Sequence, residues 1–538
     1  MSELLQEQIA QRLEQLTELS VALGHSHDTV DLLERIVALA KSMTGADGGT
    51  LYRPSADRQS LEFYITINDS LGIRQGGAVG VPGVPLYDAG GAPNLDAVAA
   101  YAAHSGESVN IDDVYQADGF NFSGMRAFDR YYGYHSQSFL TVPMNDHEGA
   151  VVGVLQLVNA LDPANGAVRP FSGTDQRFIE ALAAQAAAAL TKQQLIGQLE
   201  RLLEALVKLI NIGIDEKSPY TGRHCQLVPQ LTMLLAEAVH DTDSGPLADF
   251  RMSDGDRKEL WLAGLLHDCG KITTPVHVVD KASKLETIFD RIALVDTRFE
   301  VLLRDAEIDA LRQKLAGPAC ATEHALIDAE LAQRQAALRG ERDCLRAANI
   351  GTEGMAQDER ERVRRIGARR WVGCDGVERD LLDADEVENL TIPFGTLTAA
   401  ERLIINNHIA VTIRMLEALP WPKHLRRVPE YAGGHHERMD GKGYPRGLRG
   451  ADMSVPARLM AIADIFEALT ARDRPYKKGK MLSESLRILG KFSLNGHIDP
   501  ALFDVFIRRK VYLDFALRYM DPHQIDTVDD AAIPGYTP

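Results

Sequence analysis

Apolar and polar residues alternate in the first third of the chain in the way that strands require. Leu61–Ile67 places apolar side chains at every second position, which is typical of a strand with one buried face. Ser138–Met144 and the almost continuous apolar run Ala150–Asn159 have strand length, and we expect them to form a hairpin.

Helical spacing flanks these strands on both sides. Thr29–Met43 carries its apolar residues on one face and Phe171–Leu190 is rich in alanine, so both segments predict helices. Gly45–Gly49 is expected to be a turn before a strand that starts at Thr50, and the Gly- and Pro-rich residues 68–94 are expected to be a loop. Strands enclosed by two helices predict an α+β domain, which we place at residues 28–190.

The second of these helices is expected to run from Asp175 to about Ile214. Leucines recur in it at steps of four, three, four and three residues, at Leu195, Leu199, Leu202, Leu206 and Leu209. This heptad spacing predicts a coiled-coil seam between two copies of the chain over residues 191–214, or else a helix packed on one domain. Residues 1–27 contain an amphipathic pattern that predicts a further helix, packed on its own domain or on a second copy.

From residue 215 to the end at residue 538 the periodicity is helical, and it predicts an all-α domain. Predicted helices include Asp215–Val239, Arg257–His267 and the strongly apolar Pro456–Leu469. Another helix starts at a capping box formed by Thr398 and Glu401. Residues 285–390 are rich in charged residues and predict a helical insertion, with helices near 285–315 and 321–347.

Composition narrows the class of protein. The chain has 538 residues, of which 45% are hydrophobic, so it predicts two or three globular domains. A net charge of −18 argues against binding to DNA or to an anionic membrane surface. Five scattered cysteines without a CxxC pair argue against a disulfide framework, and no apolar run is long enough for a membrane span, so we expect a cytoplasmic protein.

Histidine and aspartate residues in the helical half have the pattern of a metal site. His435 and His436 are adjacent, and adjacent imidazoles suit a metal cluster better than a core. The other candidates lie on or beside predicted helices, and the whole set is His224, His267, Asp268, His408, His435, His436 and Asp464. Nitrogen and oxygen ligands without cysteine favour two divalent ions such as iron or manganese over structural zinc. Two such ions can clamp a phosphodiester, with Asp268 bridging them and Lys271 offsetting the phosphate charge.

The first domain resembles the GAF family of small-ligand sensor domains. The resemblance rests on Asn159, Phe171 and Asp175, which match the Asn…Phe-x-x-x-Asp signature of cyclic-nucleotide-type GAF domains. It implies that these three residues contribute to binding an unknown small ligand. The sequence departs from the signature at Ala160 and Gln176, where Lys and Glu are usual. The alternative is that the three residues only fix the exit of a strand and cap a helix.

The helical half resembles the HD-GYP family of phosphohydrolases, over about residues 210–285 and 395–515. The matching motifs are His267-Asp268-x-Gly270-Lys271, His435-His436, Gly443-Tyr444-Pro445 and Arg474-Pro475-Tyr476-Lys477. The resemblance implies that the seven residues above are the metal ligands and that Asp268 and Lys271 are catalytic. It also implies that Lys271, Gly443, Tyr444, Pro445, Arg474 and Lys477 contact the substrate.

Three departures from the HD-GYP pattern bear on function. Members with three metals carry Glu where this chain has Tyr220, so we expect two metal ions per chain. Glu467 stands where Asp is common, and the insertion separates Lys271 from His408 far more than is usual.

The resemblance implies a phosphodiesterase that hydrolyses cyclic di-GMP to pGpG, with further hydrolysis to GMP left open. The heptad spacing of the joining helix separately predicts a homodimer. Two alternatives also stay open. One is another cyclic dinucleotide as substrate, such as 3′,3′-cyclic GMP-AMP. The other is a catalytically inactive receptor. The metal, the sensor ligand, the role of the insertion and the direction of regulation are not predicted.

Overall fold

The computed structural model describes residues 29–76, 82–317, 320–351, 354–471 and 479–537, and for residues 219–222 it describes the backbone alone. The helix expected for residues 1–27 lies outside the described residues. The chain forms two compact units, Met1–Leu203 and Glu204–Pro538. Within the part of the chain that the structure describes, no helix is both long enough and apolar enough to cross a membrane.

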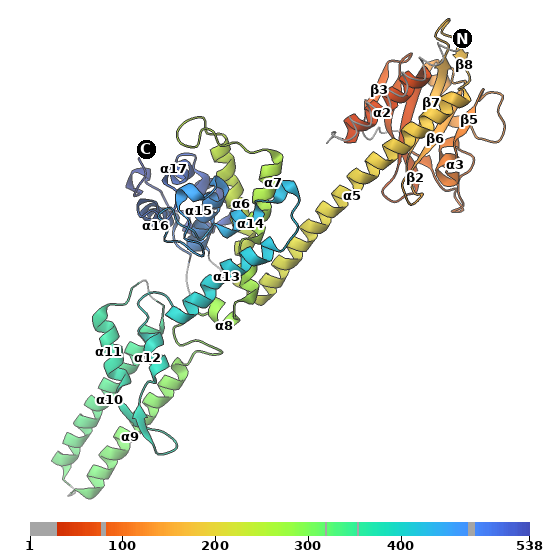
Figure 1. Cartoon of the computed structure of the whole chain (residues 1–538). Helices are drawn as coiled ribbons and strands as arrows, with labels where there is room; N and C mark the ends of the chain where they lie inside the picture. The colour runs from red at the N-terminus through yellow and green to blue at the C-terminus, as the bar shows by residue number, and fades with distance from the viewer. Residues whose placement is uncertain (1–28, 77–81, 318–319, 352–353, 472–478, 538) are drawn as a thin grey trace. The chain divides into compact units, whose positions relative to one another are not determined.

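The first unit is built on an antiparallel sheet with the strand order β3-β2-β1-β7-β6-β5 (Figure 1). β4 pairs with β2 and β8 pairs with β7. The strands are β1 (Ala46–Pro54), β2 (Ser60–Asn68), β3 (Ile73–Gly76), β4 (Val84–Pro85), β5 (Val109–Ile111), β6 (Phe139–Asn145), β7 (Val151–Leu161) and β8 (Val168–Arg169). The predicted hairpin is confirmed, since β6 pairs with β7 from Phe139 opposite Val158 to Asn145 opposite Val151.

Alternation along the strands divides the core of this unit between the two faces of the sheet. Leu51 and Leu155 are buried with the helices α2 (Thr29–Thr44) and α5 (Gly173–Lys217). Their neighbours Tyr52 and Val154 point to the opposite face and pack with α3 (Val98–Ser105). Another helix, α4 (Ser123–Tyr132), follows β5. The α+β architecture predicted for this unit is therefore confirmed.

The turn predicted at Gly45–Gly49 is confined to Gly45, whose φ is 69°, and is wrong beyond it, because β1 already starts at Ala46. Gly49 is needed for close packing rather than for a turn. A Cβ atom on Gly49 would lie 2.8 Å from Val37 Cγ1 and 3.2 Å from Leu157 Cδ2, so only glycine lets α2 approach the sheet. The predicted loop over residues 68–94 also contains two short strands, β3 and β4.

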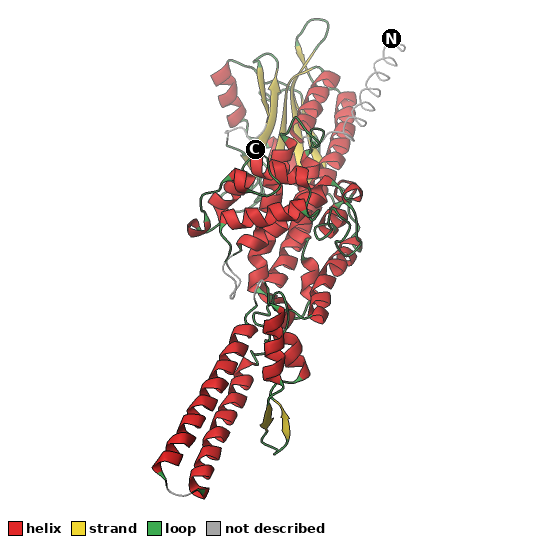
Figure 2. Ribbon diagram, turned by 90° about the vertical axis from the view of Figure 1, so that its left-hand side faces the viewer, coloured by secondary structure: helices red, strands yellow, loops and turns green. Residues whose placement is uncertain are grey.

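The second unit is almost entirely helical (Figure 2). α6 packs against α7, α15 and α18, and α13 packs against α14 and the 3₁₀ turn η1. The helices outside the insertion are α6 (Pro219–His240), α7 (Asp254–Leu266), α8 (Val276–Val279), α13 (Ala399–Glu417), α14 (Val428–Gly433), α15 (Val455–Thr470), α16 (Leu482–Leu494), α17 (Pro500–Arg508) and α18 (Val511–Tyr519). The 3₁₀ turns are η1 (Cys269–Thr273), η2 (Lys423–Leu425), η3 (Gly450–Asp452), η4 (Pro522–Gln524) and η5 (Asp530–Ala532).

The predicted helical insertion is present and has a hydrophobic core of its own. Its elements are α9 (Ile292–Ala316), α10 (Ala321–Asn349), α11 (Gln357–Gly367), β9 (Arg370–Val372), β10 (Glu378–Asp380) and α12 (Ala384–Leu390). Phe299 and Leu345, from the first two helices, are both fully buried in this core. The hairpin of β9 and β10 was not predicted.

A buried ion pair fixes the insertion to the helix that follows it. The Lys281 ammonium lies 2.8 Å from both carboxylate oxygens of Glu401 and 2.8 Å from Asn389 Oδ1 in α12. Glu401 also closes the capping box of α13 with Thr398, as predicted. The same carboxylate therefore starts α13 and holds the end of the insertion.

The predicted long helix is confirmed as α5, which extends from Gly173 to Lys217. The side chains of its leucine repeat are all exposed, with exposed fractions of 53% for Leu195, 65% for Leu199, 66% for Leu202, 42% for Leu206 and 63% for Leu209.

Candidate metal centre

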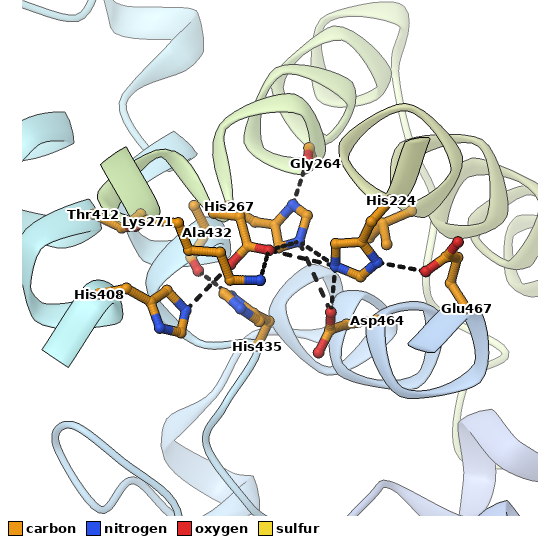
Figure 3. Close-up of polar contacts among 12 residues, drawn as sticks. His224, Gly264, His267, Lys271, His408, Thr412, Ala432, His435, Asp464 and Glu467 are labelled. Carbon is orange, nitrogen blue, oxygen red and sulfur yellow. Dashed lines mark hydrogen bonds and ion pairs between the residues drawn. The ribbon is translucent and has the colours of Figure 1, made fainter. Parts of the chain in front are cut away.

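The seven residues predicted as metal ligands lie close together in the second unit, although up to 240 positions separate them in the sequence. Figure 3 shows His224, His267, His408, His435 and Asp464 from this set. His224 lies on α6, His408 on α13 and Asp464 on α15. His267 and Asp268 follow the last turn of α7, and His435 and His436 follow α14. His267, Asp268, His408 and His435 are almost completely buried, whereas His436 and Asp464 are partly exposed.

Close approach of the backbones brings these elements together. A Cβ atom on Gly264 would lie 3.1 Å from Pro229 Cα, so α7 packs tightly on α6. A Cβ atom on Gly270 would lie 2.0 Å from the carbonyl oxygen of His408, so η1 packs directly on α13. Glycine at position 270 is therefore required for Asp268 and His408 to be neighbours.

Three histidines are oriented by the same local contact. The Nδ1 atoms of His267, His408 and His435 lie 2.5 to 2.7 Å from a carbonyl oxygen three residues earlier, at Gly264, Ile405 and Ala432 respectively. A carbonyl oxygen can only accept, so Nδ1 carries the proton and Nε2 presents its lone pair. In each ring Nε2 is therefore available as a metal ligand.

The ligand atoms form two groups that share one carboxylate. Asp268, His408, His435 and His436 form the first group, in which all ligand atoms lie within 4.8 Å of one another. His224, His267 and Asp268 form the second group by the same measure. His408 Nε2 lies 3.1 Å from Asp268 Oδ1, and His224 Nε2 lies 3.4 Å from Asp268 Oδ2. The two oxygens of Asp268 thus face different groups.

Asp464 and Glu467 complete the side of the centre that contains His224. Asp464 Oδ1 lies 3.0 Å from His224 Nε2 and 3.8 Å from His267 Nε2. Glu467, one turn further along α15, is buried and lies 2.5 Å from the other ring nitrogen of His224. It orients His224 in the way that the carbonyl groups orient His267, His408 and His435.

Electrostatics keep the aspartates charged and two histidines neutral. Burial opposes the charge on Asp268, but Lys271 and His267 outweigh it and hold the pKa of this carboxyl well below its usual range. Burial, together with His436, holds the pKa of His435 well below its usual value, and burial lowers the pKa of His436 to about 4. Neutral imidazoles and ionised carboxylates are the forms that bind metal ions.

Burial also opposes the charge on His224, but Glu467, Asp268 and Asp464 outweigh it and hold the pKa of this histidine well above its usual value. The same carboxylates favour a cation, and a metal ion bound there would displace this proton, because imidazole binds metals in its neutral form.

Lys271 and the Gly-Tyr-Pro loop border the partly exposed side. Lys271 Nζ lies 2.5 Å from Asp268 Oδ2. The Tyr444 ring stacks on His436, with ring centroids 4.8 Å apart at an angle of 20°. A Cβ atom on Gly443 would lie 2.5 Å from the backbone of Glu437, so the loop needs glycine there. Arg474 and Lys477, also predicted to contact substrate, lie outside the described residues.

The residues present suit two divalent metal ions. His435 Nε2 is buried and has no hydrogen-bond partner among the described residues. An unpartnered lone pair in a buried position is costly unless a cation accepts it. Imidazole nitrogens and carboxylate oxygens suit iron or manganese. The first group would hold one ion, and His224, His267, Asp268 and Asp464 would hold the other.

Reasoning from the sequence missed three residues that support this centre. The sequence marks Glu467 as an acid beside Asp464 on an apolar helix and as a departure from the family pattern, but not as the partner of His224. Glu437 is buried and accepts hydrogen bonds from the backbone N–H groups of Arg446 and Leu448, which shapes the Gly-Tyr-Pro loop. Thr412 accepts from the Gly270 N–H at 2.9 Å. A buried acid beside each motif was the available signal for the first two.

The residues predicted to bind a sensor ligand in the first unit all have internal partners. Asn159 accepts from the Gln137 N–H at 2.7 Å and donates to the His135 carbonyl oxygen at 2.8 Å. Asp175 accepts from the Ser172 N–H at the start of α5 and pairs with Arg169. Phe171 is buried in the core. These contacts are those of the structural alternative, in which the residues fix a strand exit and cap a helix.

Three models of known protein families match parts of the chain. A family model described as GAF domain matches residues 28–190. Two family models described as HD domain match residues 221–350 and 385–502.

Several characterised proteins are similar to part of the chain. The 3'3'-cGAMP-specific phosphodiesterase 1 of Vibrio cholerae is 49% identical over 81 residues, which are 15% of this chain and 19% of that protein. The 3'3'-cGAMP-specific phosphodiesterase 3 of the same organism is 36% identical over 141 residues, 26% of this chain and 28% of that protein. A cyclic di-GMP phosphodiesterase of Pseudomonas aeruginosa is 39% identical over 114 residues, 21% and 26% of the two chains. The chain thus covers between 19% and 28% of the length of these relatives.

Proposed function

We propose that this chain, which joins a GAF domain to an HD domain, is a metal-dependent phosphodiesterase that hydrolyses cyclic di-GMP to pGpG. The observation that carries the proposal is the pair of ligand groups that share Asp268. A carboxylate between two metal sites is the arrangement that places two cations against one phosphodiester.

Each part of the centre has a role in this reaction. Bound divalent ions would act as Lewis acids on the phosphodiester. The Nδ1 contacts hold the imidazoles of His267, His408 and His435 in place before substrate arrives, so no reorganisation is needed during the reaction. Lys271 lies on the partly exposed side, where its ammonium can move from Asp268 to a phosphate oxygen. The Tyr444 ring stiffens His436 and offers an apolar surface to a base.

Two other functions compete with this one. The first is hydrolysis of 3′,3′-cyclic GMP-AMP, which is favoured by the names of two of the similar proteins. The second is a receptor that binds a cyclic dinucleotide without hydrolysing it. The complete ligand set opposes the receptor, because a protein without catalysis has no need of seven metal ligands.

A substrate panel tests the proposal. The full chain, purified without chelators and loaded with manganese or iron, is offered cyclic di-GMP, 3′,3′-cyclic GMP-AMP and pGpG, and the products are identified by mass. We expect cyclic di-GMP to give pGpG, and the sample with pGpG as substrate decides whether hydrolysis continues to GMP. An Asp268→Asn variant treated identically controls for contaminating hydrolases. Faster hydrolysis of 3′,3′-cyclic GMP-AMP would change the substrate, and binding without any hydrolysis would establish the receptor.

We further infer that the chain acts as a homodimer and that the GAF domain regulates the HD domain in response to a small ligand. The leucine repeat of α5 exposes apolar side chains along one side of a single helix, where a second copy could bury them. α5 begins inside the GAF match and ends at Lys217, so it is the covalent route between the two domains.

Changing Leu202 and Leu206 to Lys should make the chain monomeric, because two charges would enter an apolar interface at a cost of several kcal/mol. Light scattering compares this variant with the parent and with Gln194→Lys, which adds a charge to an exposed position away from the leucine repeat. A parent that is monomeric at micromolar concentration would remove the dimer from the proposal.

A further inference from the structure

The last residue of α5 contacts the turn that carries Lys271. The ammonium of Lys217 donates hydrogen bonds to the carbonyl oxygens of Lys271, at 3.3 Å, and of Ile272. One turn earlier on α5, a Cβ atom on Gly213 would lie 4.0 Å from Ile272 Cδ1. The end of α5 therefore lies against η1, and Lys217 is the polar link between them.

The residue before Lys271 in η1 contacts α13. The Gly270 N–H donates to Thr412 Oγ1 at 2.9 Å, and the Gly270 backbone is in direct contact with the carbonyl oxygen of His408. The turn η1 is thus attached to α13 through Gly270 and to α5 through Lys217.

The carbonyl group that Lys217 binds belongs to a residue of the metal centre. The Lys271 carbonyl oxygen also accepts from the Thr274 N–H at 3.0 Å, and the Lys271 N–H donates to the Asp268 carbonyl oxygen at 2.9 Å. From this backbone the Lys271 side chain reaches the Asp268 carboxylate. A shift of the η1 backbone would therefore move the Lys271 ammonium relative to Asp268.

We propose that Lys217 is a positioning residue, whose ammonium holds η1 in the conformation that places the Lys271 ammonium beside Asp268. This inference rests on the proposed phosphodiesterase function. Among the described residues, the Lys217 ammonium donates its hydrogen bonds to the Lys271 and Ile272 carbonyl oxygens, so its effect on the centre passes through the backbone of η1 and Lys271.

The test compares Lys217→Met, which keeps the side-chain length and removes the donor, with Lys217→Arg, which keeps a donor. Lys208→Met serves as the control, because Lys208 is an exposed lysine on the same helix. Amide hydrogen exchange is measured over residues 269–274 in the full chain, with and without manganese, and cyclic di-GMP hydrolysis and metal content are measured in parallel.

We expect Lys217→Met to accelerate exchange in this segment about tenfold. We also expect it to lower kcat about tenfold at unchanged metal content, because a small misplacement of a catalytic group has effects of this size. Lys217→Arg should retain most of the parent's protection from exchange and most of its kcat. Lys208→Met should behave like the parent. Unchanged exchange in Lys217→Met, or faster exchange with unchanged kcat, would overturn the inference. Faster exchange combined with a parent that hydrolyses none of the dinucleotides would reject the proposed function but keep the role of Lys217 in holding η1.

Discussion

The two halves of the chain each bury a cluster of polar side chains, and the clusters differ in how their hydrogen bonds end. In the GAF domain, Asn159 bonds to the backbone of His135 and Gln137 and to the Tyr134 hydroxyl, which in turn donates to Asp47 at 2.5 Å. The donors and acceptors in this cluster satisfy one another. Such a cluster fixes loops and strands, because its polar groups are paired within the domain.

In the HD domain three histidines of the cluster form hydrogen bonds to backbone groups outside the cluster. The Nδ1 atoms of His267, His408 and His435 bond to carbonyl groups on the periphery, while Nε2 of each ring points inward. The carboxylate of Asp268 lies beside Nε2 of His267, and the carboxylate of Asp464 lies beside Nε2 of His224. Burial alone therefore does not identify a functional cluster. Several ring nitrogens whose lone pairs point to one place do identify it.

The strongest test of this comparison is Asp268→Ala, which removes the only carboxylate common to both ligand groups. We expect hydrolysis to fall by about 1,000-fold or more, because each 1.36 kcal/mol of lost transition-state stabilisation is tenfold in rate and a metal centre supplies several. Metal content should fall with it, and the helical circular dichroism should persist. Asp249→Ala, at an exposed position in the same domain, is the matched control. A variant that keeps full activity after metal removal would refute the metal centre.

Metal removal and replacement should show that the centre binds two ions per chain. We expect a chelator to abolish hydrolysis, two equivalents of manganese or iron to restore it, and saturating metal to raise the melting temperature by mass action. In the HD-GYP pattern, members with three metals carry Glu at the sequence position of Tyr220, so Tyr220→Glu should raise the count toward three. Elemental analysis of anaerobically purified parent measures the number, and three ions in the parent would show the argument from Tyr220 to be wrong.

The sequence predicted elements well where a local pattern decides the structure. The capping box at Thr398, the length of α5 and the helices of the insertion follow from spacing and propensity within a few turns of chain. The prediction failed at Gly48 and Gly49, which look like turn residues. Their role depends on how closely α2 packs on β1, and that distance is a tertiary property.

The same division applies to the candidate site. Motifs identified the histidines and aspartates, because adjacent His-His and His-Asp pairs are unusual in a core. The carbonyl group three residues before each of three histidines could have been derived from helical geometry, but the partner of His224 could not. Glu467 is 243 residues away in sequence, so only the packing of α15 on α6 brings the two together.

A smaller effect is expected from Glu467→Ala, which removes the orienting partner of His224 and leaves all seven predicted metal ligands in place. Outer partners of this kind change metal affinity by about 10- to 100-fold. Glu467→Gln keeps an acceptor for Nδ1 and should lose less. Competition with a chromophoric chelator measures the affinity, and kcat at saturating metal should largely recover. Unchanged affinity in Glu467→Ala would mean that His224 needs no outward hydrogen bond. The orientation of the histidines by outer partners would then not distinguish the HD cluster from the GAF cluster.

The smallest effect is expected in the GAF cluster, from Asn159→Ala. The substitution leaves buried partners such as the Gln137 N–H unsatisfied, which should cost about 1–3 kcal/mol of local stability. Asn159 also has a φ of 55°, a conformation that alanine adopts less readily than asparagine. Asn159→Gly removes the hydrogen bonds without that backbone penalty, so it separates the two contributions. Native-state hydrogen exchange at the β7 amides measures both variants in the full chain. If the cluster is closed, neither variant should alter the metal affinity of the HD domain. Loss of stability close to zero in both would show that the hydrogen bonds of Asn159 are dispensable and would reopen the case for a ligand at this position.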